Sequence, residues 1–294
     1  MATITFDYYK GSDLYSDGDI EKDLAAIVRN HGDVTELLAA ETRWPIIYHL
    51  SPVRRNLLEW YEFRPESTIL EIGAGCGALT SLLCEKAHQV VAVELSKRRA
   101  EIIQERLKNK NNLSIYVGSI EDITFEETFD YITLIGVLEY AGKYWSGSKP
   151  YSSFLQFVRK LLKPDGTLIL AIENRFGLKY WAGAREDHTG RVFDGIEGYP
   201  EDASLMTFGK LELEKLLSES GFHDIDFYYP MPDYKLPLEI FSDDFLPGLG
   251  HIKTMSPNFD MERYALFDEP LAFNSIIRNS MFPFFANSFL VFCK

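Results

Sequence analysis

The sequence predicts an α/β protein built on a doubly wound, mainly parallel sheet. From about residue 65 onward, short apolar runs typical of buried strands alternate with segments of helical periodicity. One of these runs leads into a loop with glycine at every second position and then into a helical pattern. This order of strand, glycine-rich loop and helix is typical of the first unit of such sheets.

The strand candidates are apolar runs of five to eight residues, and they span 68–72, 89–94, 113–117, 129–136, 167–173, 225–229 and 288–293. Helical candidates between them span 77–86, 97–108, 151–162 and 207–220. Ser51 and Pro52 predict the start of a helix over 51–61, because serine caps free amides and proline fits a first helical turn. Residues 163–166, Lys-Pro-Asp-Gly, predict a turn before the fifth strand.

Two regions lie outside this alternation. Residues 1–37 are acidic, with one helical piece at 20–28, and we expect an N-terminal extension lying over a single domain of residues 38–294. Within that domain, residues from about 176 to 206 and from 231 to 287 are rich in Gly, Pro, Asp and aromatics. Such insertions commonly form a binding pocket above a sheet, so we expect them on the acceptor side.

Composition limits the class of partner. The 294 residues are 46% apolar and 25% charged, which fits a globular protein with a large core. The formal net charge of −14 repels phosphate backbones and anionic membranes, so long nucleic acid is not expected as a partner. Three cysteines without a C-x-x-C pair, no leader pattern and no membrane-spanning apolar run predict a cytoplasmic protein.

The glycine-rich segment predicts a cofactor site. Gly73, Gly75 and Gly77 allow a tight turn and close approach to a ligand, and Glu94 ends the next strand 21 residues after Gly73, where a carboxylate binds ribose hydroxyls. The spacing Gly73-x-Gly75-x-x-Ala78 also fits a dinucleotide, which leaves NAD open. Glu71 would repel a pyrophosphate but suits a cationic amino group, which favours a zwitterionic sulfonium cofactor.

In these residues the sequence resembles the class I S-adenosylmethionine-dependent methyltransferases. Glu71 to Gly77 resembles their first motif, 118–121 the segment beside adenine, 129–140 the fourth-strand motif and 161–168 the following turn, so the likeness covers about 45–175. It implies a Rossmann-like fold of seven strands, the last of them, 288–293, antiparallel. It also implies that S-adenosyl-L-methionine binds at Glu71, Gly73, Gly75, Gly77, Glu94, Leu95, Ser119, Ile120, Gly136 and Val137.

The acceptor is expected to be a small molecule or glycan. Residues 174–183 and 186–190 are similar to bacterial methyltransferases associated with surface polysaccharides. Residues 136–139, Gly-Val-Leu-Glu, depart from the Asn-Pro-Pro-Tyr pattern of amino-group methylases. The sequence therefore predicts an O-methyltransferase acting on a hydroxyl of a sugar, glycan or small polar metabolite, with substrate contacts at Glu139, Tyr140 and Asn174.

His188 is the candidate general base, since a group with a pKa near 6.5 suits removal of a hydroxyl proton. It also fits an ordinary loop histidine bonded to Asp187.

Arg54 or Arg55 is suited to bind the cofactor carboxylate, or lies on a solvated helix face. Histidine spacing predicts no metal site. The alternative functions are a nicotinamide-dependent oxidoreductase and a non-catalytic module that binds the cofactor.

Overall fold

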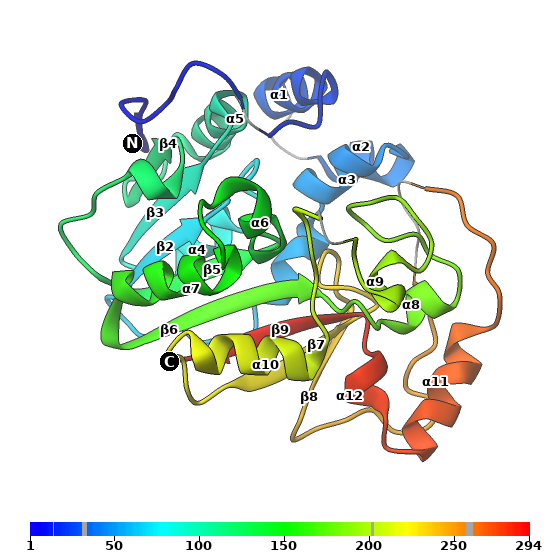
Figure 1. Ribbon diagram of the computed structural model, residues 1–294. Coiled ribbons are helices and arrows are strands. Elements are labelled where there is room, and N and C mark those ends of the chain that lie inside the picture. The colour runs from blue at the N-terminus through cyan, green and yellow to red at the C-terminus, as the bar shows by residue number, and fades with distance from the viewer. Residues whose placement is uncertain (14, 31–33, 201–202, 257–260) are drawn as a thin grey trace. The chain divides into compact units, whose positions relative to one another are not determined.

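The computed structural model describes residues 1–13, 15–30, 34–200, 203–256 and 261–294. The chain forms two compact units, one of Met1–Leu134 and Leu161–Gly166, the other of Ile135–Lys160 and Thr167–Lys294. The predicted α/β class with a mostly parallel, doubly wound sheet is confirmed (Figure 1). The strand count of seven is wrong, because the described residues form a sheet of nine strands. The additional strands are β1 (Thr3–Thr5) and β8 (Glu239–Ser242).

The first unit is built on parallel strands. Its strand order is β1-β4-β3-β2-β5, with β2 (Thr68–Ile72), β3 (Gln89–Glu94), β4 (Leu113–Val117) and β5 (Phe129–Ile135). Each neighbouring pair runs parallel. The carboxyl ends of parallel strands lie at one edge of a sheet, so the loops after β2, β3 and β4 come together there.

The helices of the first unit tie the N-terminal residues to the sheet. They are α1 (Ile20–Asn30), α2 (Thr35–Ala40), α3 (Trp44–Leu50), α4 (Thr80–Lys86) and α5 (Lys97–Leu107), with the 3₁₀ turn η2 (Ile120–Asp122). Leu24 of α1 is fully buried in a cluster with Ile46, Leu50, Cys76 and Ile102. The buried Leu24 and the pairing of β1 with β4 therefore tie this N-terminal segment to the unit. Residues 14 and 31–33 of the predicted extension lie outside the described residues.

Two local predictions are wrong. The helix expected over 51–61 is the short 3₁₀ helix η1 (Pro52–Leu57), although Ser51 caps it by accepting a hydrogen bond from the Val53 amide. The turn expected at 163–166 is part of β6 (Leu162–Glu173). Proline is tolerated close to the start of a strand, and the side chains of Lys163 and Asp165 pair with Asp130 and Arg64 there.

The second unit carries the antiparallel strands. Its order is β6 from Thr167 onward, then β9, β7 and β8, with β7 (Asp226–Met231) and β9 (Ser288–Cys293). β9 runs antiparallel to both β6 and β7. The antiparallel last strand is thus confirmed. The remaining elements are η3 (Leu138–Tyr140), α6 (Ala141–Tyr144), α7 (Pro150–Leu161), α8 (Leu178–Trp181), α9 (Asp194–Glu197), α10 (Lys210–Glu219), α11 (Glu269–Arg278) and α12 (Phe282–Phe285). Within the described ranges, the chain has no helix with the length and apolar character that crossing a membrane requires.

Candidate functional site

The glycine-rich loop after β2 depends on backbone conformations that favour glycine. Gly73, Gly75 and Gly77 have φ angles of 77°, 57° and 78°. The amides of Gly73 and Ala74 donate hydrogen bonds of 2.9 and 3.1 Å to the carbonyl of Val93, which ties the loop to β3. A Cβ at Gly77 would lie 3.3 Å from the Ile103 side chain, so this glycine also permits close packing of α5.

Glu94 lies beside this loop at the end of β3. Its Oε2 accepts a 2.7 Å hydrogen bond from the Gly75 amide and its Oε1 a 2.9 Å bond from the Ser96 amide. Burial raises the pKa of the carboxyl, and the positive charge of Arg99 opposes that rise. The sheet therefore brings together the two parts of the predicted cofactor motif that are 21 residues apart.

Glu71 is buried one residue before the end of β2. The Thr80 hydroxyl donates a 2.5 Å hydrogen bond to its Oε2. Burial raises the pKa of Glu71 to about 7, with the charge of Arg54 acting in the opposite direction. Arg54 is buried with its guanidinium 4.4 Å from the Tyr48 ring centre, whereas Arg55 forms ion pairs with Glu59 and Glu85. Of the two arginines, the charge of Arg54 therefore acts on Glu71.

The predicted adenine-side residues follow β4. Ser119 caps η2 by accepting a hydrogen bond from the Glu121 amide, Ile120 is buried, and Leu95 after β3 is half-buried. The amide of Gly118 donates to the carbonyl of Glu94 at 2.9 Å. These contacts place the segment next to Glu94, and the binding role of each residue stays a prediction.

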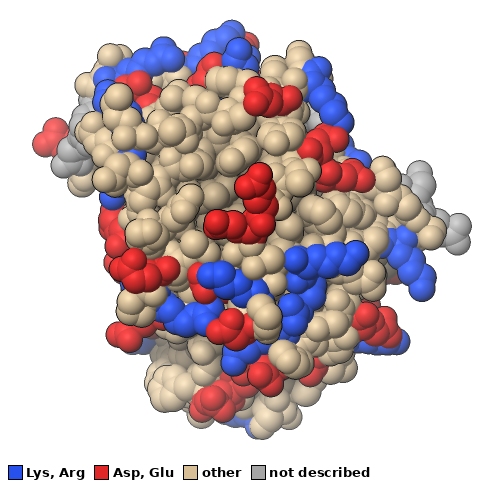
Figure 2. Space-filling model, turned by 90° about the vertical axis from the view of Figure 1, so that its left-hand side faces the viewer, with Lys and Arg blue, Asp and Glu red and all other residues tan. Residues whose placement is uncertain are grey.

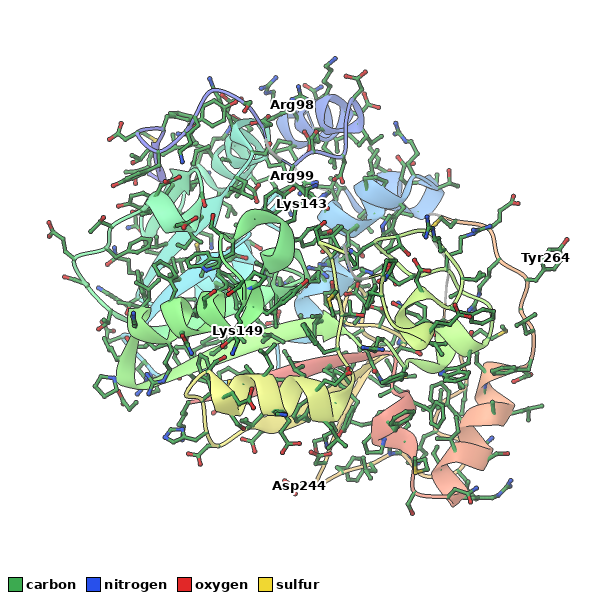
Figure 3. The ribbon with its side chains drawn as sticks, in the orientation of Figure 1. Arg98, Arg99, Lys143, Lys149, Asp244 and Tyr264 are labelled. Atoms are coloured by element: carbon green, nitrogen blue, oxygen red, sulfur yellow. The ribbon has the colours of Figure 1, made fainter. Side chains whose placement is uncertain are left out.

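Sequence reasoning missed a charged network from the N-terminal residues. Asp17 Oδ2 lies 3.0 Å from His49 Nε2 and 2.5 Å from Arg99 Nη2, and Glu21 accepts a 2.8 Å hydrogen bond from Arg99 Nε. Arg99 lies beside Arg98 at the start of α5 (Figure 3). No spacing in the sequence links residues about 80 positions apart, so this network could not have been predicted.

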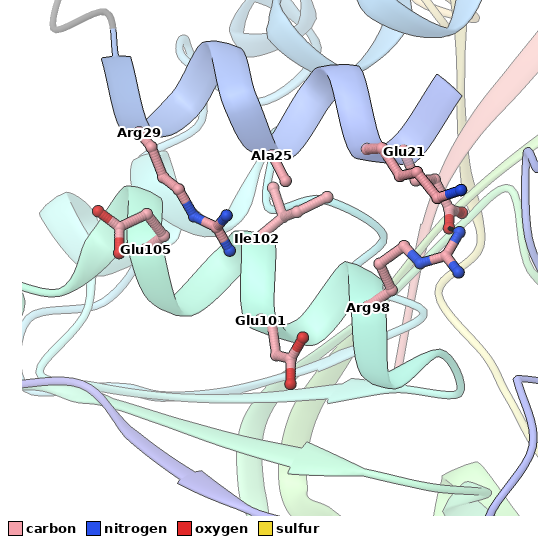
Figure 4. A pocket seen from close by; sticks show the side chains of 8 residues that line it. Glu21, Ala25, Arg29, Arg98, Glu101, Ile102 and Glu105 are labelled. Carbon is pink, nitrogen blue, oxygen red and sulfur yellow. Dashed lines mark hydrogen bonds and ion pairs between the residues drawn. The ribbon is translucent and has the colours of Figure 1, made fainter. Parts of the chain in front are cut away.

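A surface pocket lies between α1 and α5. Its charged walls largely neutralise each other: Glu21, for example, pairs with Arg98 at 3.5 Å (Figure 4). None of the predicted cofactor residues lines it.

We expect Gly75→Val to weaken binding of S-adenosylhomocysteine by at least about tenfold, because a side chain would occupy the path of close ligand approach. The φ of 57° also imposes strain of about 1–2 kcal/mol on any L residue, so stability should fall as well. Gly250→Val is the matched control: Gly250 has a φ of 76° and open space around it. It should lose stability only. Equal calorimetric affinities in the two variants would contradict a ligand site at this loop.

Affinity for S-adenosylhomocysteine should rise as pH increases from 6 to 8. Below the Glu71 pKa of about 7 the carboxyl is neutral, and above it the carboxylate attracts the cationic amino group of the ligand. We expect a change of about 3- to 10-fold, the difference between a neutral and a charge-assisted hydrogen bond. Glu71→Gln keeps the shape and removes the ionisation, so its calorimetric titrations should lack this pH dependence. The same pH dependence in both proteins would rule out the role of Glu71.

In the second unit, the residues after β5 lead into a buried carboxyl group. Gly136 has a φ of 70°, and a Cβ there would lie 2.7 Å from the Tyr234 hydroxyl, so the turn requires glycine. Val137 precedes η3, which carries the buried Glu139. Burial and the nearby charge of Glu173 raise the pKa of Glu139 to about 8. Tyr140 packs its ring 5.3 Å from the imidazole of His188.

Glu139, Glu173 and His188 form a buried cluster. Each offers one metal-ligating atom, and the three atoms lie within 4.8 Å of one another. His188 Nε2 lies 3.7 Å from Glu173 Oε2, too far for a hydrogen bond. Sequence analysis found two members of this cluster, and it missed Glu173, which ends the predicted fifth strand.

The cluster changes the expected state of His188. Burial alone would lower the pKa of the imidazole, but Glu173 and Glu139 raise it to about 9. At neutral pH the imidazole of His188 is therefore protonated. Only the neutral imidazole can act as a general base. Asp187 is not its partner, since Asp187 accepts hydrogen bonds from Lys179, Tyr180 and Lys235.

Asn174 is occupied by the backbone. Its amide nitrogen donates 2.7 Å hydrogen bonds to the carbonyls of Phe284 and Ala286, and its Oδ1 accepts one from the Phe176 amide. These bonds give Asn174 a structural role that joins the end of β6 to α12. Its predicted contact with substrate stays a prediction.

Comparison with known proteins agrees with this geometry. Residues 70–170 match the family described as "Methyltransferase domain". "Ribosomal RNA small subunit methyltransferase A" from Syntrophus aciditrophicus is 33% identical over 100 residues, 34% of this chain and 34% of that protein. "Malonyl-[acyl-carrier protein] O-methyltransferase" from Priestia megaterium is 32% identical over 118 residues, 40% of each chain. The chain thus spans about a third to a half of the length of the first curated relatives it matches.

One solved structure supports the fold over most of the chain. It is titled a complex between the Haloferax volcanii Trm112 methyltransferase activator and the putative methyltransferase. The match has a TM-score of 0.50 at 16% identity and covers 90% of this chain and 96% of that one. Residues 70–170, which contain the glycine-rich loop and Glu94, are thus similar to a methyltransferase domain, and the solved structure supports the fold alone.

Proposed function

We propose that this protein transfers a methyl group from S-adenosylmethionine to a hydroxyl of a small polar acceptor, such as a sugar or glycan. The observation that carries the proposal is the buried Glu94 carboxylate, fixed beside the glycine-rich loop by the amides of Gly75 and Ser96. A carboxylate in this position accepts hydrogen bonds from ribose hydroxyls. Glu71 adds a group suited to the amino end of the cofactor.

We assign to the second unit the part of the reaction that the cofactor does not supply, which is the nucleophile and the removal of its proton. The sulfonium of the cofactor supplies both the methyl group and the leaving group, so the protein has to align a nucleophile and assist loss of its proton. Glu139, Glu173 and His188 are the buried ionisable groups that support this role, with Tyr140 packed against the imidazole.

Charge and sequence favour a small acceptor over RNA. The net charge is −14, and on the face shown in Figure 2 acidic and basic side chains are interspersed. The sequence Gly-Val-Leu-Glu at 136–139 differs from the pattern of amino-group methylases, and the Priestia megaterium relative is by name an O-methyltransferase. The resemblance that the sequence of 174–183 and 186–190 suggests to polysaccharide-associated methyltransferases is our reason for including glycans among the acceptors.

Ligand binding followed by an acceptor screen tests the proposal. S-adenosylmethionine and S-adenosylhomocysteine should raise the melting temperature, while NAD and NADP should leave it unchanged. Labelled cofactor is then incubated with sugars, nucleotide sugars, glycan fragments and ribosomal RNA. Transfer to a carbohydrate hydroxyl supports the proposal. Stabilisation by NAD would indicate an oxidoreductase, labelling of RNA alone would overturn the acceptor class, and binding without transfer to any pool would indicate a non-catalytic module.

A further inference from the structure

Three buried ligand atoms in the second unit meet without hydrogen-bond partners. Glu139 Oε2, Glu173 Oε2 and His188 Nε2 are each inaccessible and unpaired by hydrogen bonds among the residues that the structure describes. The side chains of Glu173 and His188 are 0% and 8% exposed, and Glu139 is 1% exposed. Buried polar atoms normally have partners, so three such atoms at one point indicate a missing ligand common to all of them.

The residues around these atoms hold them in place. Glu173 Oε1 is bound by Lys235 at 2.5 Å and by the Tyr234 hydroxyl at 3.3 Å, so its other oxygen is the one turned toward His188. The amides of His188 and Thr189 both donate 2.7 Å hydrogen bonds to Glu186 Oε2, which fixes the turn carrying the imidazole. Such secondary contacts are typical of metal sites, where they orient the ligating groups.

The surrounding charge also favours a cation. Buried or nearly buried carboxylates of Glu139, Glu173, Asp187 and Asp233 face two ammonium groups, those of Lys179 and Lys235. A metal needs Glu139 ionised and His188 neutral, and in that state four negative charges face two positive charges. One divalent cation would then balance the two uncompensated charges.

We propose that Glu139, Glu173 and His188 bind a divalent transition-metal cation of the Mn²⁺ type. Two carboxylate oxygens and one imidazole nitrogen suit such ions, whereas Mg²⁺ prefers ligand sets made of oxygen alone. Three protein ligands leave coordination positions for water or an acceptor oxygen. An acceptor hydroxyl bound to the cation would lose its proton more readily. This catalytic use of the cation rests on the proposed function, whereas binding of the cation does not.

Mn²⁺ alone tests the site. We expect the chelator-treated, dialysed full chain to bind one equivalent of Mn²⁺ in electron paramagnetic resonance titrations. Glu139→Gln and His188→Gln should each weaken this binding by at least about tenfold. Glu219→Gln is the control, because Glu219 lies on α10 in a surface pair with Lys215 and should leave Mn²⁺ affinity unchanged. Zn²⁺ should compete for the site, and Mg²⁺ should compete weakly.

Affinity for S-adenosylhomocysteine and circular dichroism, measured on every variant, identify those that fail to fold. Glu139 and His188 are replaced in separate variants, so one variant still tests the site if the other fails to fold. Absence of saturable Mn²⁺ binding in a chain that still binds S-adenosylhomocysteine would overturn the metal site and leave the proposed function intact. Equal Mn²⁺ affinity in the folded variants and the control would overturn it as well. Stoichiometric Mn²⁺ binding in a chain that methylates nothing would support the site and count against the proposed function.

Discussion

Replacing His188 with alanine is expected to lower turnover by about 10²- to 10⁴-fold above about pH 9, where the imidazole is neutral; this is the range usual for a group that removes a proton in the rate-limiting step. Affinity for S-adenosylhomocysteine should stay nearly unchanged. The reason is that the central cofactor residues, Glu71 to Gly77 and Glu94, belong to the first unit, whereas His188 lies with Glu139 and Glu173 in the second. The variant therefore separates binding from chemistry.

The measurement needs the acceptor identified by the screen and single-turnover rates with saturating labelled cofactor. His223→Ala is the matched control, because His223 is exposed and contacts Lys294 through its backbone. Turnover of His188→Ala close to that of the control would exclude His188 from the reaction.

A chelator separates two ways in which His188 could act. If its imidazole accepts the proton directly, the wild-type rate should not respond to removal of divalent cations. If it acts as a metal ligand, chelation should reproduce most of the loss seen in His188→Ala, and added Mn²⁺ should restore the rate of the wild type alone.

The cofactor motif could be predicted because its parts are local in sequence. Gly73, Gly75 and Gly77 lie in a loop with left-handed backbone, so the helix predicted from residue 77 begins only at Thr80. Glu94 is confirmed as a neighbour of that loop. The link between them is a single parallel strand pair, β2 with β3, which the apolar pattern of both strands already indicates. For this reason the position of Glu94 beside the loop could be predicted without information on contacts between distant residues.

The rest of the candidate site depends on contacts between distant residues. Lys235 approaches Glu173 from 62 positions away, and Asp17 reaches Arg99 across 82, so neither pair leaves a periodic signal. Contacts between distant residues also shift the pKa of His188, which amino-acid composition cannot show. An isolated imidazole has an ordinary pKa, and the two carboxylates beside His188 raise it. The three-residue strand β1 was missed because so short a run has no period of its own.

Glu94→Ala is expected to weaken binding of S-adenosylhomocysteine by about 10- to 150-fold, which corresponds to loss of a charge-assisted contact of about 1.5–3 kcal/mol. Both ribose hydroxyls would lose their acceptor. The structure adds a second effect, because the same carboxylate holds the amides of Gly75 and Ser96. Its removal also takes away a negative charge that stabilises the buried Arg99 cation, so the variant should unfold at a lower temperature than the wild type.

Calorimetric titration well below the melting temperature separates the loss of affinity from the loss of stability. Glu101→Ala is the matched control: Glu101 lies on α5 in a solvent-exposed pair with Lys97 at 3.9 Å, and its removal should change neither quantity measurably. Glu94→Gln tests the charge itself, since the amide keeps the size of the side chain but presents an NH₂ group to one of the two backbone donors. Its affinity should therefore fall nearly as far as that of Glu94→Ala. A folded Glu94→Ala protein with the dissociation constant of the Glu101→Ala control would show that the ribose lies elsewhere.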